Sequence, residues 1–221
     1  MSEGSTPVVA PDGTIYVGTY SRYNHSQGHT VRVSAAGAFM GAYPFGWDVT
    51  PAVHEREDGT FSVITKENRY PEAGSYCGDP LWCPNERVPG QDPGYYITQL
   101  GEELDVEWRF KSTNTESCSR LPNGQLDCVS DHPQGFEWCV NALAVDKRGT
   151  VYMNSEDGRL YAINRDGSLR ESVFLQLSLR AAYTPLSLGA DGKIYTQNAG
   201  HLFAVGSNAP RRRAVGKTTS P

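Results

Sequence analysis

Short runs of apolar and β-branched residues alternate with glycine-containing turns along most of the chain. Residues 141–168 show the pattern well, because apolar runs there are separated by turns that contain Gly149, Gly158 and Gly167. Glycine accepts the positive φ that tight hairpins require. The pattern therefore predicts a series of short antiparallel strands and an all-β fold.

This strand-and-turn unit recurs four times. Its first turn carries a glycine in every copy, namely Gly13, Gly59, Gly149 and Gly192. The first two and the last two of these glycines are separated by roughly 45 residues, which is the period of a four-stranded propeller blade. The interval from Gly59 to Gly149 is about twice as long. We interpret it as one blade with two insertions, and a degenerate extra blade is the alternative.

The repeat predicts one β-propeller domain over residues 1–206, built from about four four-stranded blades. The expected blades cover about 5–46, 47–111, 136–176 and 180–206, with insertions at 67–94 and 112–136 that lack strand alternation. The last blade has only three expected strands, and no strand is expected before Ser5 to complete it. A partial or half ring follows, and its exposed edge predicts self-association with another chain.

The motif TPVVAPDGTIYVGT, followed by VEWRF and LYAINRDGSL, resembles the quinoprotein-alcohol-dehydrogenase-like propeller repeat, also called the pyrroloquinoline-quinone-like repeat. The resemblance covers about residues 5–206. It implies a propeller, in a family that includes quinone-dependent dehydrogenases, an outer-membrane assembly lipoprotein and proteins without a cofactor.

A dehydrogenase of this family stacks its quinone, held with calcium, on a disulfide between adjacent cysteines. The chain contains no adjacent cysteine pair, and no motif of a hydrolase elbow or zinc protease. We therefore expect a non-catalytic binding or scaffolding propeller with no cofactor. A fragment or half-ring of a quinone-dependent enzyme, with PQQ and calcium, is the alternative.

Composition narrows the possible partners. The chain has 221 residues and a formal net charge of −5, which does not favour nucleic acid as a partner. No apolar run is long enough for a membrane span, and the start MSEGSTP does not resemble a signal peptide. Residues 207–221, with three consecutive arginines, are expected to form a disordered basic tail.

Four of the five cysteines are placed to form disulfides. Cys77 faces Cys83 and Cys118 faces Cys128 across short turn-rich segments, while Cys139 lies in an apolar run and is expected to be a buried thiol. Neither pair has the spacing of a zinc knuckle. Disulfides indicate a periplasmic or secreted protein. A cytosolic protein with reduced thiols is the alternative.

Strand direction sorts the connections onto two faces of the propeller. One face, the short-turn face, carries the first-to-second and third-to-fourth strand turns. The other, the long-loop face, carries residues 20–29, 112–137, 154–158 and 198–200 and the insertion at 67–94. Long loops on a rigid scaffold often carry function, so we expect a protein or glycan to bind there. The alternative is that the loops only cover the channel or the open edge.

The candidate ligand-binding residues on the long-loop face are aromatic, amide or charged, as a polar partner requires. Trp82 is the aromatic expected to contact a partner, whereas Trp47, Trp108 and Trp138 are expected to pack between blades. No metal site is expected, because His25 and His29 lie on a loop and Glu156 is part of a turn-like segment. The candidates are Tyr20, Arg22, Tyr23, His25, His29, Glu67, Arg69, Trp82, Asn154 and Glu156.

Overall fold

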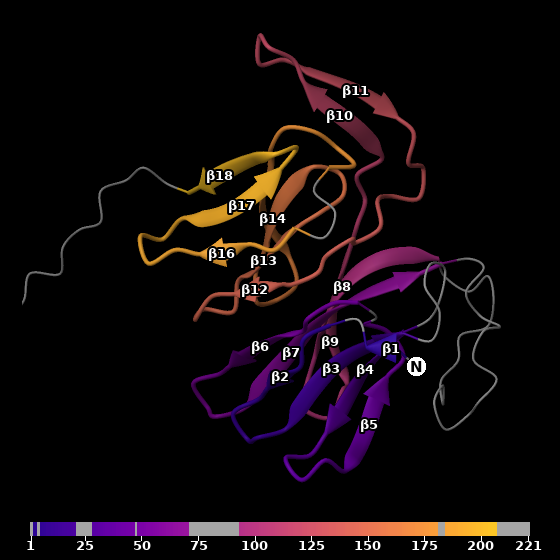
Figure 1. Cartoon of the computed structure of the whole chain (residues 1–221), viewed down its shortest axis with the longest axis vertical. Coiled ribbons are helices and arrows are strands. Elements are labelled where there is room, and N and C mark those ends of the chain that lie inside the picture. The colour runs from indigo at the N-terminus through magenta and orange to yellow at the C-terminus, as the bar shows by residue number, and fades with distance from the viewer. Residues whose placement is uncertain are drawn as a thin grey trace, which may run out of the picture.

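The computed structural model describes residues 2–3, 5–20, 28–46, 48–70, 93–180 and 184–206. All regular elements in this part of the chain are β-strands, and they form antiparallel sheets arranged side by side (Figure 1). In the first sheet, two short strands pair with the same neighbour. Its strands are β1 (Ser2–Glu3), β2 (Val8–Val9), β3 (Ile15–Tyr20), β4 (Gly28–Val33) and β5 (Phe39–Tyr43).

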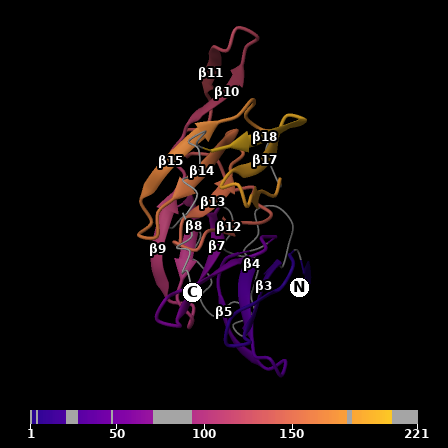
Figure 2. The ribbon, with the colours of Figure 1, turned by 90° about the vertical axis from the view of Figure 1, so that its left-hand side faces the viewer.

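Three further sheets form blades two, three and four (Figure 2). Blade two contains β6 (Ala52–Glu55), β7 (Phe61–Arg69), β8 (Gly94–Leu100) and β9 (Val106–Lys111). Blade three contains β12 (Ala144–Val145), β13 (Val151–Asn154), β14 (Arg159–Ile163) and β15 (Leu169–Phe174). Among the residues that the structure describes, blade four has three strands, β16 (Ser187–Leu188), β17 (Ile194–Asn198) and β18 (His201–Val205). The sheets do not close, so the fold is an all-β partial propeller with an incomplete last blade, as predicted.

The first turn of each blade is built in the same way. Gly13, Gly59, Gly149 and Gly192 adopt φ values of +86°, +84°, +82° and +82°, a region that L-residues with a side chain rarely occupy. An aspartate in each turn accepts hydrogen bonds from the residues that follow it. In blade two, the Asp58 carboxylate accepts from the backbone and the hydroxyl of Thr60, and these bonds lower the pKa of Asp58. The sequence repeat is therefore a repeat of turn geometry.

Two predictions about strands need correction. Blade one begins before residue 5, because β1 pairs with β3, with Ser2 opposite Tyr20. This strand extends blade one, and it does not complete blade four, as predicted. The insertion at 112–136 also contains strands, β10 (Glu116–Arg120) and β11 (Leu126–Ser130), which form a two-stranded sheet. Every residue of β11 is exposed, so no burial pattern marks this strand in the sequence.

Apolar residues fill the two interfaces between the first three blades. Tyr16 and Tyr43 pack with Phe61 and Leu100 between blades one and two. A second cluster lies between blades two and three around Trp138, which is 0% exposed.

Two tryptophans lie at the interface between blades two and three. Trp138 packs edge-on against Tyr161, with ring centroids 5.3 Å apart. Trp108 of blade two donates from Nε1 to the carbonyl oxygen of Arg165 in blade three, at 3.0 Å. Both pack between blades, as predicted, while Trp47 lies outside the described residues. Within the described ranges, no helix has the length and hydropathy to cross a membrane.

Candidate functional site

On the long-loop face, the end of β7 is tied to the segment that leads into blade three. Asn68 Nδ2 donates to the carbonyl oxygen of Trp138, and Trp138 N donates to Asn68 Oδ1, both at 3.2 Å. This reciprocal pair fixes Glu137 and Cys139, the two neighbours of Trp138. The Tyr70 hydroxyl donates to Glu137 and fixes its carboxylate further.

Cys139 lies between two carboxylates. Its Sγ is 3.2 Å from Glu137 Oε1 and 3.3 Å from Glu156 Oε2. Burial raises the pKa of the Cys139 thiol, and the charges of Glu137 and Glu156 raise it further. Burial likewise raises the pKa of Glu156. Cys139 is thus a buried, protonated thiol that donates a hydrogen bond, in agreement with the prediction that it is buried.

An ion pair between Asp48 and Lys66 lies next to these groups. Lys66 has 1% of its side chain exposed, and burial raises the pKa of Asp48 while Lys66 opposes the rise. The negative charge of Glu137 also raises the pKa of Asp48. The cluster is therefore one connected network between blades two and three, in which three carboxylates face one lysine.

The three groups around the thiol are also the ones that could hold a metal ion. The ligand atoms of Glu137, Cys139 and Glu156 lie within 4.8 Å of one another. A thiolate with two carboxylates suits zinc more than calcium. Metal binding would require the Cys139 thiol to lose its proton, and burial raises the pKa of this thiol.

Glu67 and Arg69 lie at the interface between blades one and two. Glu67 is fully buried, and its carboxylate accepts from Arg69 Nε at 2.6 Å, Arg109 Nε at 2.9 Å and Thr98 Oγ1 at 2.8 Å. The Tyr43 hydroxyl donates to the same carboxylate. Such a set of donors offsets the cost of burying the charge. The structure thus gives Glu67 and Arg69 internal partners.

The remaining candidates are not gathered into one pocket. Asn154 is buried and links blades three and four, because its Nδ2 lies 2.9 Å from Thr184 Oγ1 and 2.6 Å from Thr196 Oγ1. His29 is 1% exposed, and burial lowers its pKa. Of the candidates, only Glu156 belongs to the cluster around Cys139. The side chain of Tyr20 lies outside the described part, as do Arg22, Tyr23, His25, Trp82, Cys77 and Cys83.

Asn154 was a candidate, but the sequence reasoning missed that an asparagine recurs at the same place in other blades. Asn68, Asn154 and Asn198 each stand at or near the end of the second strand of a blade. Asn198 accepts from Leu177 N at 2.8 Å and donates to Leu177 O at 2.9 Å, in the same manner as Asn68 with Trp138. Aligning the ends of the second strands, rather than their turns, reveals this signal in the sequence.

A hairpin projects from this face, and we call residues 116–130 the hairpin arm (Figures 1 and 2). Cys118 is paired directly opposite Cys128, and the two form a disulfide, as predicted. Cys118 N donates to Ser178 Oγ at 2.7 Å, and Ser178 N donates to the Cys118 carbonyl oxygen at 2.9 Å. Strand β10 is therefore attached to the segment that leaves blade three.

Arg120 reinforces this attachment. Its guanidinium donates to the carbonyl oxygens of Phe174 and Leu175, both at 3.1 Å, and lies over the Phe174 ring at 5.5 Å. The other strand of the arm, β11, pairs with β10 on one side and with no strand on the other among the described residues.

The arm also exposes apolar side chains. Val129 is 62% exposed, Leu126 42% and Leu121 39%. An open strand edge beside exposed apolar residues is a template for association with another chain. Two-stranded hairpins are only marginally stable alone in water, so the disulfide and the Arg120 contacts hold this template in a fixed conformation.

Comparisons with known proteins concern the fold alone. No protein-family model matches the chain, and no curated protein matches it. A protein of unknown function from Bacteroides caccae superposes with a TM-score of 0.48 at 12% identity, over 95% of this chain and 58% of that one. BBS1N, solved in complex with ARL6DN, gives 0.47 at 12% identity, over 92% and 57%. The Dos1 propeller gives 0.36 at 11% identity, over 86% and 50%. The chain thus spans about half the length of these structures.

Two observations bear on the quinone and calcium implied by the family resemblance. The disulfide that the structure shows joins Cys118 to Cys128 across the hairpin arm rather than two adjacent cysteines. Glu67, the most deeply buried of the candidate carboxylates, is fully engaged by arginine, threonine and tyrosine. The quinoprotein-like repeat remains a resemblance in sequence.

Proposed function

We propose that this protein is a non-catalytic binding propeller that engages another protein through the hairpin arm. The observation that carries the proposal is the exposed strand β11, with Leu126 and Val129 beside its open edge and the Cys118–Cys128 disulfide behind it. Strand addition to such an edge draws affinity from main-chain hydrogen bonds and specificity from alternate side chains.

The blades supply rigidity to this arm. Backbone hydrogen bonds join β10 to the segment after β15, so the arm is fixed to blade three by more than its own chain connections. Preorganisation of this kind reduces the entropy lost on association. The disulfide is compatible with an oxidising, extracytoplasmic compartment.

The experiment compares affinity enrichment by the wild-type protein with that by the double variant Leu126→Lys/Val129→Lys. The control is Val9→Lys, because Val9 is 66% exposed on blade one, outside both the arm and the edge of blade four. Proteins from the source organism that bind wild type and control but not the arm variant support the proposal. Equal recovery by all three proteins refutes it, provided that all three have the same melting temperature.

Self-association at blade four is a separate part of the proposal. Blade four ends in β18, which is an edge strand among the described residues. We infer that a second copy pairs there. Light scattering over a range of protein concentrations tests it, and a constant monomer mass at every concentration contradicts it.

A further inference from the structure

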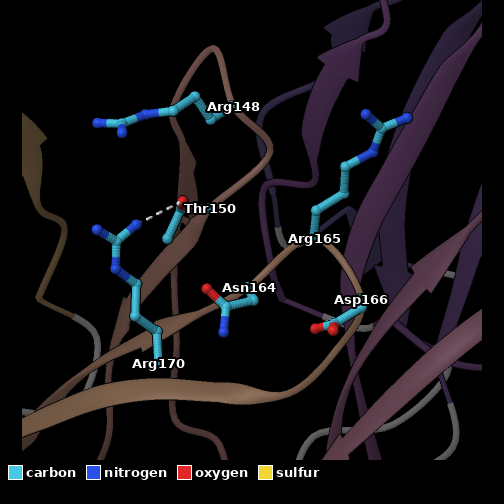
Figure 3. Close-up of a pocket in the computed structure, with 6 residues that line it drawn as sticks. All are labelled: Arg148, Thr150, Asn164, Arg165, Asp166 and Arg170. Carbon is cyan, nitrogen blue, oxygen red and sulfur yellow. Dashed lines mark hydrogen bonds between the residues drawn. The ribbon is translucent and has the colours of Figure 1, made fainter.

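The short-turn face of blade three contains a hollow bordered by arginines (Figure 3). Its volume is about 530 Å³. In the close-up, the guanidinium groups of Arg148 and Arg170 lie on one side of the hollow and Arg165 lies on the other. The lining residues are Arg148, Thr150, Asn164, Arg165, Asp166 and Arg170.

The arginines have few partners within the protein. Arg148 has 74% of its side chain exposed, and its Nε is 3.9 Å from Asp146 Oδ2. Arg170 makes a long contact of 3.4 Å with Thr150 Oγ1. The Arg165 side chain forms no hydrogen bond or ion pair with any described residue. Most of the donors on the three guanidinium groups are therefore open to a ligand.

The nearby carboxylates are used by their own turns. Asp166 Oδ1 accepts from Ser168 N at 3.0 Å and Ser168 Oγ at 2.6 Å. Asp146 Oδ1 accepts from Arg148 N at 2.9 Å and Thr150 N at 3.0 Å. These bonds lower the pKa of both aspartates and hold one carboxylate oxygen of each in its own turn, and Asp146 Oδ2 also accepts from the Tyr152 hydroxyl at 3.2 Å. The arginines are thus only partly neutralised.

An apolar cleft continues from this hollow into the space between blades three and four. Its volume is about 770 Å³, and it shares Arg148 and Arg170 with the hollow. Leu160 and Val173 line one wall and Leu188, Ile194 and Val205 line the other. Four basic side chains and two acidic ones border it, whereas the whole chain carries a formal net charge of −5. The local charge is therefore opposite to that of the protein.

We propose that this hollow and cleft form a binding groove for an acidic peptide segment of a partner protein. Its carboxylates pair with Arg148, Arg165 and Arg170, because guanidinium groups bind carboxylates in bidentate geometry. Its apolar side chains enter the cleft between the blades. A simple anion would satisfy the arginines but leave the apolar walls exposed to water. The groove lies on the opposite face from the hairpin arm and does not depend on the arm's function.

The test uses a short fluorescein-labelled peptide of alternating Glu and Leu, with fluorescence anisotropy as the readout. The double variant Arg148→Glu/Arg170→Glu should weaken binding about tenfold or more, since two charge pairs become repulsive. Binding by wild type should also weaken with added salt. The matched control is Arg180→Glu, because Arg180 is exposed and is bonded through its backbone to Ala199 on the long-loop side.

Three results overturn the proposal. They are absence of binding to the wild-type protein, equal affinity in the Arg148→Glu/Arg170→Glu variant, and equal affinity for a peptide in which Ser replaces Leu. Displacement of the peptide by an equal concentration of inorganic phosphate also counts against it, because it shows a site for simple anions. The arm variant Leu126→Lys/Val129→Lys should bind the peptide as wild type does, which separates this groove from the proposed function.

Discussion

Removal of the Cys118–Cys128 disulfide should release the hairpin arm while the blades stay folded. The two cysteines are 10 residues apart in sequence, and the bond closes the loop between them. Loop-closure entropy assigns about 2.5–3 kcal/mol to a loop of this size, which corresponds to about a hundredfold increase in opening of the arm. The perturbation is the double variant Cys118→Ser/Cys128→Ser.

The blades should tolerate this change because neither cysteine belongs to the apolar clusters between them. The hydrogen bonds between Cys118 and Ser178 use the backbone of Cys118, so serine can keep them. Arg120 also still reaches the carbonyl oxygens of Phe174 and Leu175. The loss should therefore fall on the arm beyond this anchor, above all on β11.

Hydrogen exchange measured by mass spectrometry checks this prediction. Amides in residues 116–130 should exchange about a hundredfold faster in the variant, while those in β8 keep their protection. Cys139→Ala is the matched control, because it removes a cysteine and leaves the disulfide intact. Unchanged exchange in the arm would refute the assigned role of the disulfide. Equally accelerated exchange in β8 would refute the independence of the arm.

Three further predictions concern buried ionisable groups. Glu67→Gln should lower the free energy of unfolding by about 1–3 kcal/mol, because the buried hydroxyls of Tyr43 and Thr98 lose a charged acceptor. Urea denaturation measures this change. The Cys139 thiol should resist an aromatic disulfide reagent at pH 8 in the native protein and react after unfolding, because burial raises the pKa of the thiol. Peptide mass spectrometry measures the fraction of Cys139 that is labelled. Glu156→Gln should stabilise the protein at pH 7 but not near pH 4. Burial raises the pKa of Glu156 in the folded protein, so the folded state loses stability as the pH rises above the ordinary pKa of a glutamate and Glu156 ionises. Glutamine does not ionise and avoids this loss.

An exposed glutamate provides the control for both glutamate variants. Glu57→Gln should change stability by less than about 0.5 kcal/mol at either pH, since Glu57 lies on the surface. A Glu67→Gln variant as stable as Glu57→Gln would show that Tyr43 and Thr98 do not need a charged acceptor. Rapid labelling of Cys139 in the native state, or a Glu156→Gln gain that persists at pH 4, would contradict the assigned burial and pKa.

The blade strands could be predicted because each lies next to a turn that constrains the chain. Gly13 and Gly149 require a positive φ, and the strands that follow them have buried positions at regular intervals, as in β13. The second strand of blade two is longer than predicted. It reaches Arg69, so the charged residues Glu67 and Arg69, which were predicted to lie in the insertion at 67–94, belong to a strand. Internal partners make these charges compatible with a buried strand, and no local sequence pattern records a partner elsewhere in the chain.

The strands of the hairpin arm and the cluster around Cys139 could not be predicted from the sequence. The disulfide was predictable, because Cys118 and Cys128 flank a turn. The strands that carry them were not, because their main contacts are with solvent and with the segment around Ser178, far along the chain. Glu137 and Trp138 are likewise held beside Cys139 by Tyr70 and Asn68 of blade two, about 70 residues earlier in the chain. Such sites depend on contacts between blades, which the pattern within one blade does not contain.

The blade interfaces differ in chemistry, and this difference accounts for the groove proposed on the short-turn face. Apolar clusters fill the first two interfaces, but among the described residues neither cluster includes a residue of blade four. Asn154 and Asn198 instead connect blade four to blade three by hydrogen bonds on the long-loop side. Because these bonds fix the two sheets at one end, the other end can keep a cleft of about 770 Å³ between them. The asparagines therefore hold blade four beside the attached arm and leave the opposite side of the same interface open to a second partner.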